Sequence, residues 1–176
     1  MNKLLPVILA AFLAVSACAG EPKATALSPL KVNLDEIVAR GVVHPVNGLT
    51  AAGQPDEASL KVFADSGYAA VIDLRTAGEE RGLDEPAVVE ELGMDYVSLP
   101  IGRDGISFEN ARSLDELIKS YEGPVLVHCG SSNRVGALLA LRASLDGADD
   151  AAALDVGLEG GLTGLESKVR EVLATD

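Results

Sequence analysis

The chain has 176 residues, 48% of them hydrophobic, which suits one domain with its own core. Only 3% are aromatic and none is Trp, so the stacking platforms of single-stranded nucleic-acid binders are missing. The net charge of −13 also opposes binding to nucleic acid and to anionic membrane surfaces. We therefore expect any anion site to be built locally, from backbone amides and one or two Arg.

Residues 1–17 have the features of a signal peptide. Lys3 provides a positive start, and a nearly unbroken apolar run extends from Leu4 to Val15. These twelve residues are too few to cross a bilayer, which takes about 20. Their length fits the apolar core of a signal peptide, and small residues follow directly, as a cleavage site requires.

Two kinds of processing fit the end of this segment. The run Ala17-Cys18-Ala19 has the small-x-small form that ordinary signal peptidase accepts, which would give a plain secreted protein. The run Val15-Ser16-Ala17-Cys18 resembles the lipobox of bacterial lipoproteins, in which the Cys becomes the first residue and carries the lipid. We favour lipidation at Cys18, with residues 18–39 as lipidated N-terminus and tether. By the same resemblance, Ala19 favours the outer membrane, so we expect a periplasmic domain that meets the membrane only through its lipid.

Residues 40–176 alternate between strand and helix patterns. The apolar residues of 69–74 fall on both faces, as in a parallel strand covered by helices. Alternating strands and helices predict an α/β domain whose central, mostly parallel sheet is flanked by helices. The expected strands are 48–53 (a strand or a turn), 69–74, 96–99 and 125–127. The expected helices begin at the caps Asp56 and Ser107 and otherwise span 84–92, 135–145, 149–158 and 163–173.

The segment 124–136 carries the candidate chemistry. A buried strand ends at His128, a helix begins near Val135, and small residues fill the loop between Cys129 and Arg134. Free amides of such a loop point inward, and the helix N-terminus carries about half a positive charge. The planar Arg134 fork can hold two oxygens of a tetrahedral anion, and the same positive field favours a Cys129 thiolate. A nucleophile and an electrostatic clamp therefore share one loop.

His-Cys, a short loop and then Arg resemble the signature of cysteine-dependent phosphatases. More narrowly, Gly53-Gln54-Pro55, the run 71–75 and the loop at Cys129 resemble the beta-lactamase-hydrolase-like family of phosphatase-like domains, over about residues 40–147. The resemblance implies a cofactor-free hydrolase that acts on a small phosphorylated or other oxyanion substrate through a cysteinyl-phosphate at Cys129. It also implies that His128 orients the loop through hydrogen bonds and is not the base. The oxyanion-binding residues would be Arg134 and the loop residues Gly130, Ser131, Ser132 and Asn133.

Further polar side chains are expected beyond the carboxyl ends of the strands, where open α/β sheets bind ligands. Asp104 lies 25 residues before Cys129, where phosphatases, by resemblance, carry the acid that protonates the leaving oxygen. An ordinary Asp-Gly turn is the alternative. Arg75 either binds substrate charge or forms an ion pair with Glu79 or Glu80. Arg103 either adds local positive charge or is a solvated loop residue.

Two departures from the phosphatase pattern keep other functions open. Four residues separate Cys129 from Arg134, where phosphatases usually have five, and rhodanese-type sulfurtransferases use the shorter spacing around a persulfide. Val135 follows Arg134, where phosphatases usually have a hydroxyl residue. The alternatives are sulfur transfer through a Cys129 persulfide and a non-catalytic anion-binding lipoprotein. We expect no metal site, because the chain has two His and no Cys/His spacing that suits zinc.

Overall fold

The computed structural model describes residues 43–46 and 49–175. The signal peptide predicted for residues 1–17, the lipidation at Cys18 and the tether over 18–39 lie outside these residues. Within them, none of the helices combines the length and the apolar character that a membrane crossing needs.

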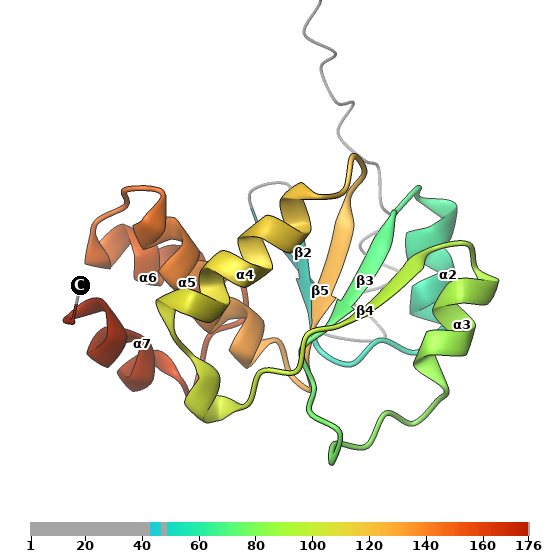
Figure 1. Ribbon diagram of the computed structural model, residues 1–176, viewed down its shortest axis with the longest axis horizontal. Helices are drawn as coiled ribbons and strands as arrows, with labels where there is room; N and C mark the ends of the chain where they lie inside the picture. Colours follow the sequence, from blue (N-terminus) through green and yellow to red (C-terminus); the bar gives the residue numbers. More distant parts are fainter. Residues whose placement is uncertain (1–42, 47–48, 176) are drawn as a thin grey trace, which may run out of the picture.

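Five strands form one sheet in the order β1-β2-β5-β3-β4 (Figure 1). Strands β2, β5, β3 and β4 run parallel, and only β1 pairs antiparallel, with β2. The predicted α/β fold with a mostly parallel sheet is confirmed, whereas β1 has no counterpart among the predicted strands. The strands are β1 (Val43–Val46), β2 (Leu49–Ala52), β3 (Ala70–Asp73), β4 (Asp95–Ser98) and β5 (Val125–His128).

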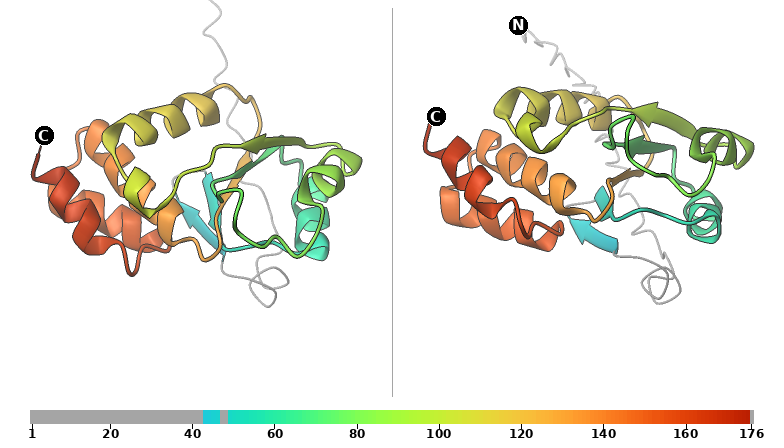
Figure 2. Two further views of the ribbon diagram at one scale, coloured as in Figure 1. Left: turned by 60° about the horizontal axis from the view of Figure 1, so that its bottom comes forward. Right: turned by 90° about the horizontal axis from the view of Figure 1, so that it is seen from below.

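Helices cover both faces of the sheet, as Figures 1 and 2 show. On one face, α2 (Glu57–Asp65) and α3 (Glu85–Glu91) bury Leu60 and Val89 against Val71 and Leu126. The opposite face carries the other helices and a larger apolar cluster that includes Ile72 and Val127. The helices there are α4 (Phe108–Lys119), α5 (Asn133–Leu145), α6 (Asp150–Glu159) and α7 (Glu166–Leu173).

The two central strands β3 and β5 are buried at all four of their positions. Both of their faces are covered by helices, which is why their sequences are apolar without alternation. Their register pairs Asp73 with His128 at the carboxyl ends. The last side chains of the two strands therefore lie side by side, directly before the loop that begins at Cys129.

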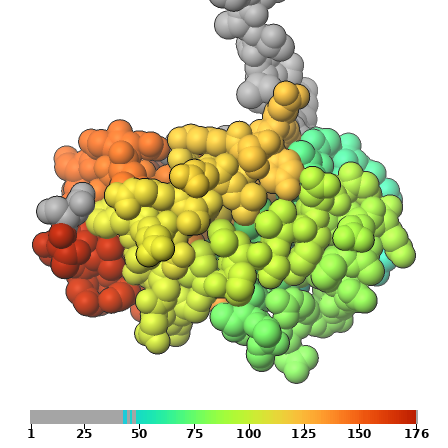
Figure 3. Space-filling model, viewed as in Figure 1, coloured from blue at the N-terminus to red at the C-terminus, as the bar shows by residue number. Residues whose placement is uncertain are grey.

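The helix starts follow the predicted capping chemistry. Asp56 accepts a hydrogen bond from the backbone N–H of Ser59 at 2.7 Å, and Ser107 accepts one from Asn110 at 3.3 Å. Both N-cap predictions are confirmed. Helix α5 begins at Asn133, earlier than the predicted Val135, because Ser132 turns the chain in a left-handed conformation with φ 63°. In the space-filling view α6 and α7 lie at the end of the molecule opposite α2 and α3 (Figure 3).

Candidate functional site

The loop from Cys129 to Arg134 joins β5 to α5 at the carboxyl ends of the parallel strands, as the sequence predicts. Its start is fixed by β2, because the N–H of Cys129 donates to the carbonyl of Ala52 at 3.3 Å. A further bridge joins Ser131 to Gly53, the residue after β2. These contacts hold the loop backbone against the sheet.

The far end of the loop is tied to the connection between α6 and α7. The Ser132 hydroxyl donates to the Gly160 carbonyl at 2.8 Å. The Asn133 Oδ1 atom accepts the backbone N–H groups of Thr163 and Leu165, at 2.8 and 3.3 Å. Ser132 and Asn133 were predicted to bind the anion through the loop amides, and that role stays a prediction; their side chains anchor the loop.

Arg134 is held by an ion pair with Glu79, which the sequence did not reveal as a site residue. Its Nη1 and Nη2 atoms donate to the two Glu79 carboxylate oxygens at 2.7 and 2.5 Å. Nη1 also lies 3.2 Å from the carbonyl oxygen of Ile101, to which it donates. Contacts within the protein therefore fix the orientation of the guanidinium, which is what electrostatic preorganisation requires.

In the ion pair of Arg134 and Glu79, each group stabilises the charged form of the other. The hydrogen bond from Arg134 is the main cause that lowers the pKa of Glu79 to about 2. The hydrogen bond with Glu79 is likewise the main cause that raises the pKa of Arg134, and interactions with the Cys129 side chain raise it further. Arg134 and the Cys129 side chain therefore lie close enough to interact.

A cavity of about 410 Å³ opens beside the loop, within the usual range for small-molecule sites. Four connections contribute to its wall, namely β3–α3, β4–α4, β5–α5 and α6–α7. Cys129 is 1% exposed and is not part of that wall. The lining residues are Thr76, Glu79, Gly102, Arg103, Ser131, Asn133, Arg134 and Leu165.

Arg103 and Asp104 share one 3₁₀ turn, Arg103–Gly105, but differ in their relation to the cavity. Arg103 contributes to the lining, whereas Asp104 is exposed and does not. The side chain of Asn110 fixes this turn by donating to the Gly105 carbonyl at 2.6 Å. The role of Asp104 as general acid stays a prediction.

Arg75 is not a substrate-binding residue, and that prediction is wrong. The side chain is 1% exposed, and its Nε and Nη2 atoms donate to the two oxygens of Asp73, each at 2.9 Å. Nη2 also donates to Glu85. The partners are therefore two buried carboxylates and not Glu79 or Glu80. Buried carboxylates must be paired, so the acids at 73 and 85 were the signal that sequence reasoning overlooked.

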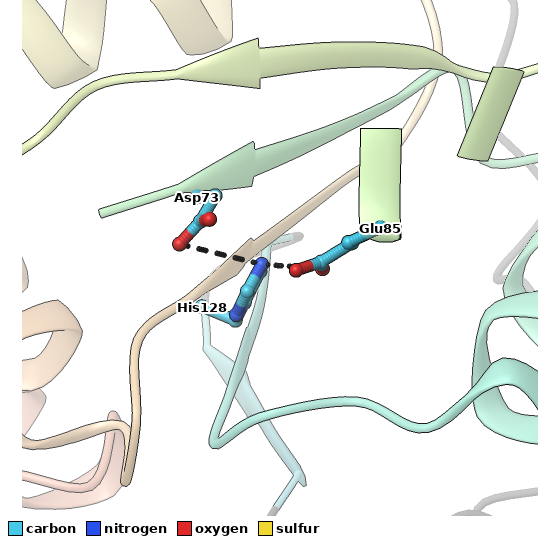
Figure 4. A group of neighbouring side chains, drawn as sticks. All are labelled: Asp73, Glu85 and His128. Carbon is cyan, nitrogen blue, oxygen red and sulfur yellow. Dashed lines mark ion pairs between the residues drawn. The ribbon is translucent and has the colours of Figure 1, made fainter. Parts of the chain in front are cut away.

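His128 completes this buried network (Figure 4). Its Nε2 atom lies 2.8 Å from Glu85 Oε1 and 3.8 Å from Asp73 Oδ1. The ring therefore faces the carboxylates. None of the hydrogen bonds found among residues 43–46 and 49–175 joins the ring to the loop. His128 acts on the loop through the strand end, as the residue directly before Cys129.

The carboxylate of Asp73 has the largest set of partners in the network. Tyr96 donates its hydroxyl to Oδ2 at 2.8 Å, and Arg81 donates to the same oxygen at 3.2 Å. Burial alone would raise the pKa of Asp73, but the hydrogen bonds from Arg75 and Tyr96 and the electrostatic interaction with His128 outweigh burial and lower it. Burial, with the hydrogen bond to Asp73, raises the pKa of Tyr96 to about 12.

Asp73, Glu85 and His128 also form a group whose ligand atoms lie within 4.8 Å of one another, which is the spacing of a metal site. The Arg75 guanidinium, however, hydrogen-bonds both carboxylates. Both carboxylates thus already have a cationic partner. We assign the group as a structural ion-pair network.

We predict that Arg75→Gln lowers the free energy of unfolding by about 3–5 kcal/mol, because it leaves two buried carboxylates without their cation. Urea denaturation followed by far-UV circular dichroism measures this, since the chain has no Trp. Arg170→Gln is the control, because Arg170 and Glu166 form an exposed pair on α7 whose loss costs less than about 1 kcal/mol. Equal stability losses for the two variants would refute the structural role of Arg75.

Comparison with known proteins identifies the family. Residues 43–156 match the family model described as beta-lactamase hydrolase-like protein, phosphatase-like domain. The beta-lactamase hydrolase-like protein of Agrobacterium fabrum is 33% identical over 103 residues, which cover 56% of this chain and 24% of the relative. The chain thus matches about a quarter of the length of that curated relative.

Solved structures share the fold. A candidate phosphatase of Neisseria meningitidis superimposes with a TM-score of 0.63 at 21% identity, over 73% of this chain and 93% of that one. TpbA of P. aeruginosa, in a complex with phosphotyrosine, gives a TM-score of 0.55 at 20% identity, over 76% and 96%. These likenesses place the chain in the cysteine-phosphatase fold.

Proposed function

The chain belongs to the phosphatase-like domain family of beta-lactamase hydrolase-like proteins, and from this membership and the site geometry we propose that it hydrolyses a phosphomonoester through a cysteinyl-phosphate at Cys129. The observation that carries the proposal is the Arg134 guanidinium, which Glu79 and the Ile101 carbonyl orient beside the Cys129 loop. A preoriented Arg at the start of a helix is a site for a tetrahedral oxyanion.

The proposed reaction has two displacements at phosphorus. The Cys129 thiolate attacks, a sulfur–phosphorus bond forms, and the bond to the leaving oxygen breaks. Asp104 gives its proton to that oxygen, while Arg134 and the loop amides hold the three remaining oxygens. Water, deprotonated by the Asp104 carboxylate, then attacks phosphorus and releases inorganic phosphate and the Cys129 thiolate. No cofactor takes part.

We predict that the chain, purified in mild detergent under reducing conditions, hydrolyses p-nitrophenyl phosphate. Cys129→Ser should lower kcat by about 10³-fold or more, because it removes the nucleophile. Asp104→Asn should lower kcat by about 10²-fold or more for phenyl phosphate, and less for p-nitrophenyl phosphate, whose leaving group needs a proton less. Equal rates for the parent and Cys129→Ser would contradict the mechanism.

Sulfur transfer is the second candidate function, because four residues separate Cys129 from Arg134. In that reaction the Cys129 thiolate takes a sulfur atom from thiosulfate, releases sulfite, and passes the sulfur to cyanide as thiocyanate. No general acid is needed, so Asp104→Asn should leave thiocyanate formation unchanged. A non-catalytic anion-binding lipoprotein would show neither reaction and would bind phosphate equally well after Cys129→Ser.

Glu79 gives a separate prediction, because its ion pair orients Arg134. Glu79→Gln should lower kcat/KM for p-nitrophenyl phosphate by about 10–100-fold, as the clamp loses its charged support. Glu80→Gln is the matched control, since Glu80 is the exposed neighbour and does not line the cavity. A loss of similar size in both variants would show that Glu79 acts only through overall charge.

The pH dependence follows from the lowered pKa of Glu79. A carboxylate with a pKa of about 2 is ionised at every assay pH from about 5 to 8. The stabilising contribution of the Glu79–Arg134 ion pair is present above the ordinary Glu pKa of about 4.3. It is lost only as the pH falls towards 2. The pH–rate profile of Glu79→Gln should therefore keep the shape of the parent profile at a lower height.

The lipid anchor at Cys18 and an outer-membrane, periplasmic location are part of this proposal and rest on the sequence of residues 1–19. Expression in a Gram-negative host with an alkyne fatty acid should label the parent and not Cys18→Ala. Labelling of both variants, or of neither, would contradict the anchor. Cys129→Ala is the control, because the thiol at 129 lies in the folded domain and should leave labelling unchanged.

A further inference from the structure

Resting on the proposed phosphatase activity, we propose that Arg103 is a specificity-determining residue that binds a second negative group, carried by the leaving-group part of the substrate. The preferred substrate class would be phosphomonoesters whose alcohol bears a carboxylate or a further phosphate.

The first observation is that Arg103 makes none of the ion pairs, hydrogen bonds or aromatic contacts found among the described residues. Every other described Arg has such a partner. Acidic residues outnumber basic ones by 27 to 14, so pairing is easily available to an exposed Arg in this chain. The other arginines and their partners are Arg75 with Asp73 and Glu85, Arg81 with Asp73, Arg112 over Phe108, Arg134 with Glu79, Arg142 with Asp115, and Arg170 with Glu166.

The second observation is the charge of the cavity wall. Arg103, Arg134 and Glu79 are the charged lining residues. Glu79 offsets the charge of Arg134 through two hydrogen bonds. Arg103 therefore supplies the uncompensated positive charge of the cavity, against the negative charge of the whole molecule.

The third observation is position. Arg103 reaches the cavity from the β4–α4 connection, whereas the loop that would hold the phosphoryl group comes from β5–α5. A cavity of about 410 Å³ has room for a substrate larger than phosphate itself. Arg103 also precedes Asp104, the proposed donor to the leaving oxygen, in one 3₁₀ turn. An anion bound by Arg103 would thus lie on the leaving-group side.

The size of the effect follows from solvent exposure. Arg103 is exposed, so water and salt screen its charge. An exposed ion pair contributes little, and we expect a preference of about three- to fivefold that weakens as the salt concentration rises. Lys should retain much of this preference, since the charge and not only the planar fork attracts the anion.

The test measures binding by calorimetry to the full chain carrying Cys129→Ser, which cannot turn substrate over by the proposed route. The probes are 4-carboxyphenyl phosphate, 1,4-phenylene bisphosphate and the neutral analogue 4-carbamoylphenyl phosphate. On this background we compare Arg103→Gln, Arg103→Lys and the control Arg112→Gln. The control removes the same charge from an exposed Arg on α4 that does not line the cavity.

We expect the parent and Arg112→Gln to bind at least one charged probe about three- to fivefold more tightly than the neutral one at low salt. Arg103→Gln should abolish this preference, and Arg103→Lys should restore most of it. The probe preferred tells whether the second group is a carboxylate or a phosphate.

Three outcomes would overturn the proposal. Arg103→Gln and Arg112→Gln could show the same preference for the charged probes, the parent could show no preference, or no probe could bind. Hydrolysis by the chain with Cys129 intact is measured separately. A preference that depends on Arg103 but is not accompanied by hydrolysis would retain the recognition role and reject the phosphatase mechanism.

Discussion

The site depends on the buried network of Asp73, Arg75, Glu85 and His128. These side chains are all at most 1% exposed, and buried charges are tolerated only when they are paired. The pairing joins the carboxyl ends of β3 and β5 to the first residue of α3. Three elements are thereby fixed together at the point where the loop from Cys129 to Arg134 begins.

The network also determines where Glu79 lies. The connection from β3 to α3 has Arg75 near its start, and Glu85 is the residue that follows it. Both ends are held by the same ion pairs, so the segment between them is confined. Thr76 adds a local restraint, since its N–H and hydroxyl donate to Glu79 Oε1 at 2.9 and 3.1 Å. Glu79 can then meet Arg134, 55 residues later in the chain, with little further ordering.

The sequence predicted the features that depend on local pattern. The α/β architecture follows from alternating apolar runs, the helix starts follow from Asp56 and Ser107, and the loop at Cys129 follows from its small residues. Asp73 and Glu85 were visible as acids near Arg75, but the sequence could not reveal that Glu85 reaches Arg75 or that Glu79 reaches Arg134, because these carboxylates lie on other parts of the chain. Strand β1 was missed for a similar reason, since the four residues of β1 become a strand only by pairing with β2.

The short spacing between Cys129 and Arg134 has a structural explanation. Ser132, buried and left-handed at φ 63°, lets α5 begin at Asn133, so Arg134 already belongs to the first turn. Hydrogen bonds to residues outside the loop hold this tight turn. Ser132 donates to the carbonyl of Gly160, and the Asn133 side chain accepts the backbone N–H groups of Thr163 and Leu165. Gly136 permits this approach, because a Cβ there would lie 2.3 Å from the backbone nitrogen of Leu162.

The anchoring segment therefore comes from a part of the chain that the family match, which ends at residue 156, does not include. Leu165, in the same segment, lines the cavity, so the match covers most of the site but not its whole wall.

The second departure from the phosphatase pattern is Val135, which follows Arg134 where phosphatases usually have a hydroxyl residue. It is fully buried in the core between the sheet and α4–α7, which means that a hydroxyl at this position would face apolar side chains. In the proposed mechanism, assistance in releasing phosphate from Cys129 therefore falls to Asp104 in the β4–α4 turn and not to the residue that follows Arg134.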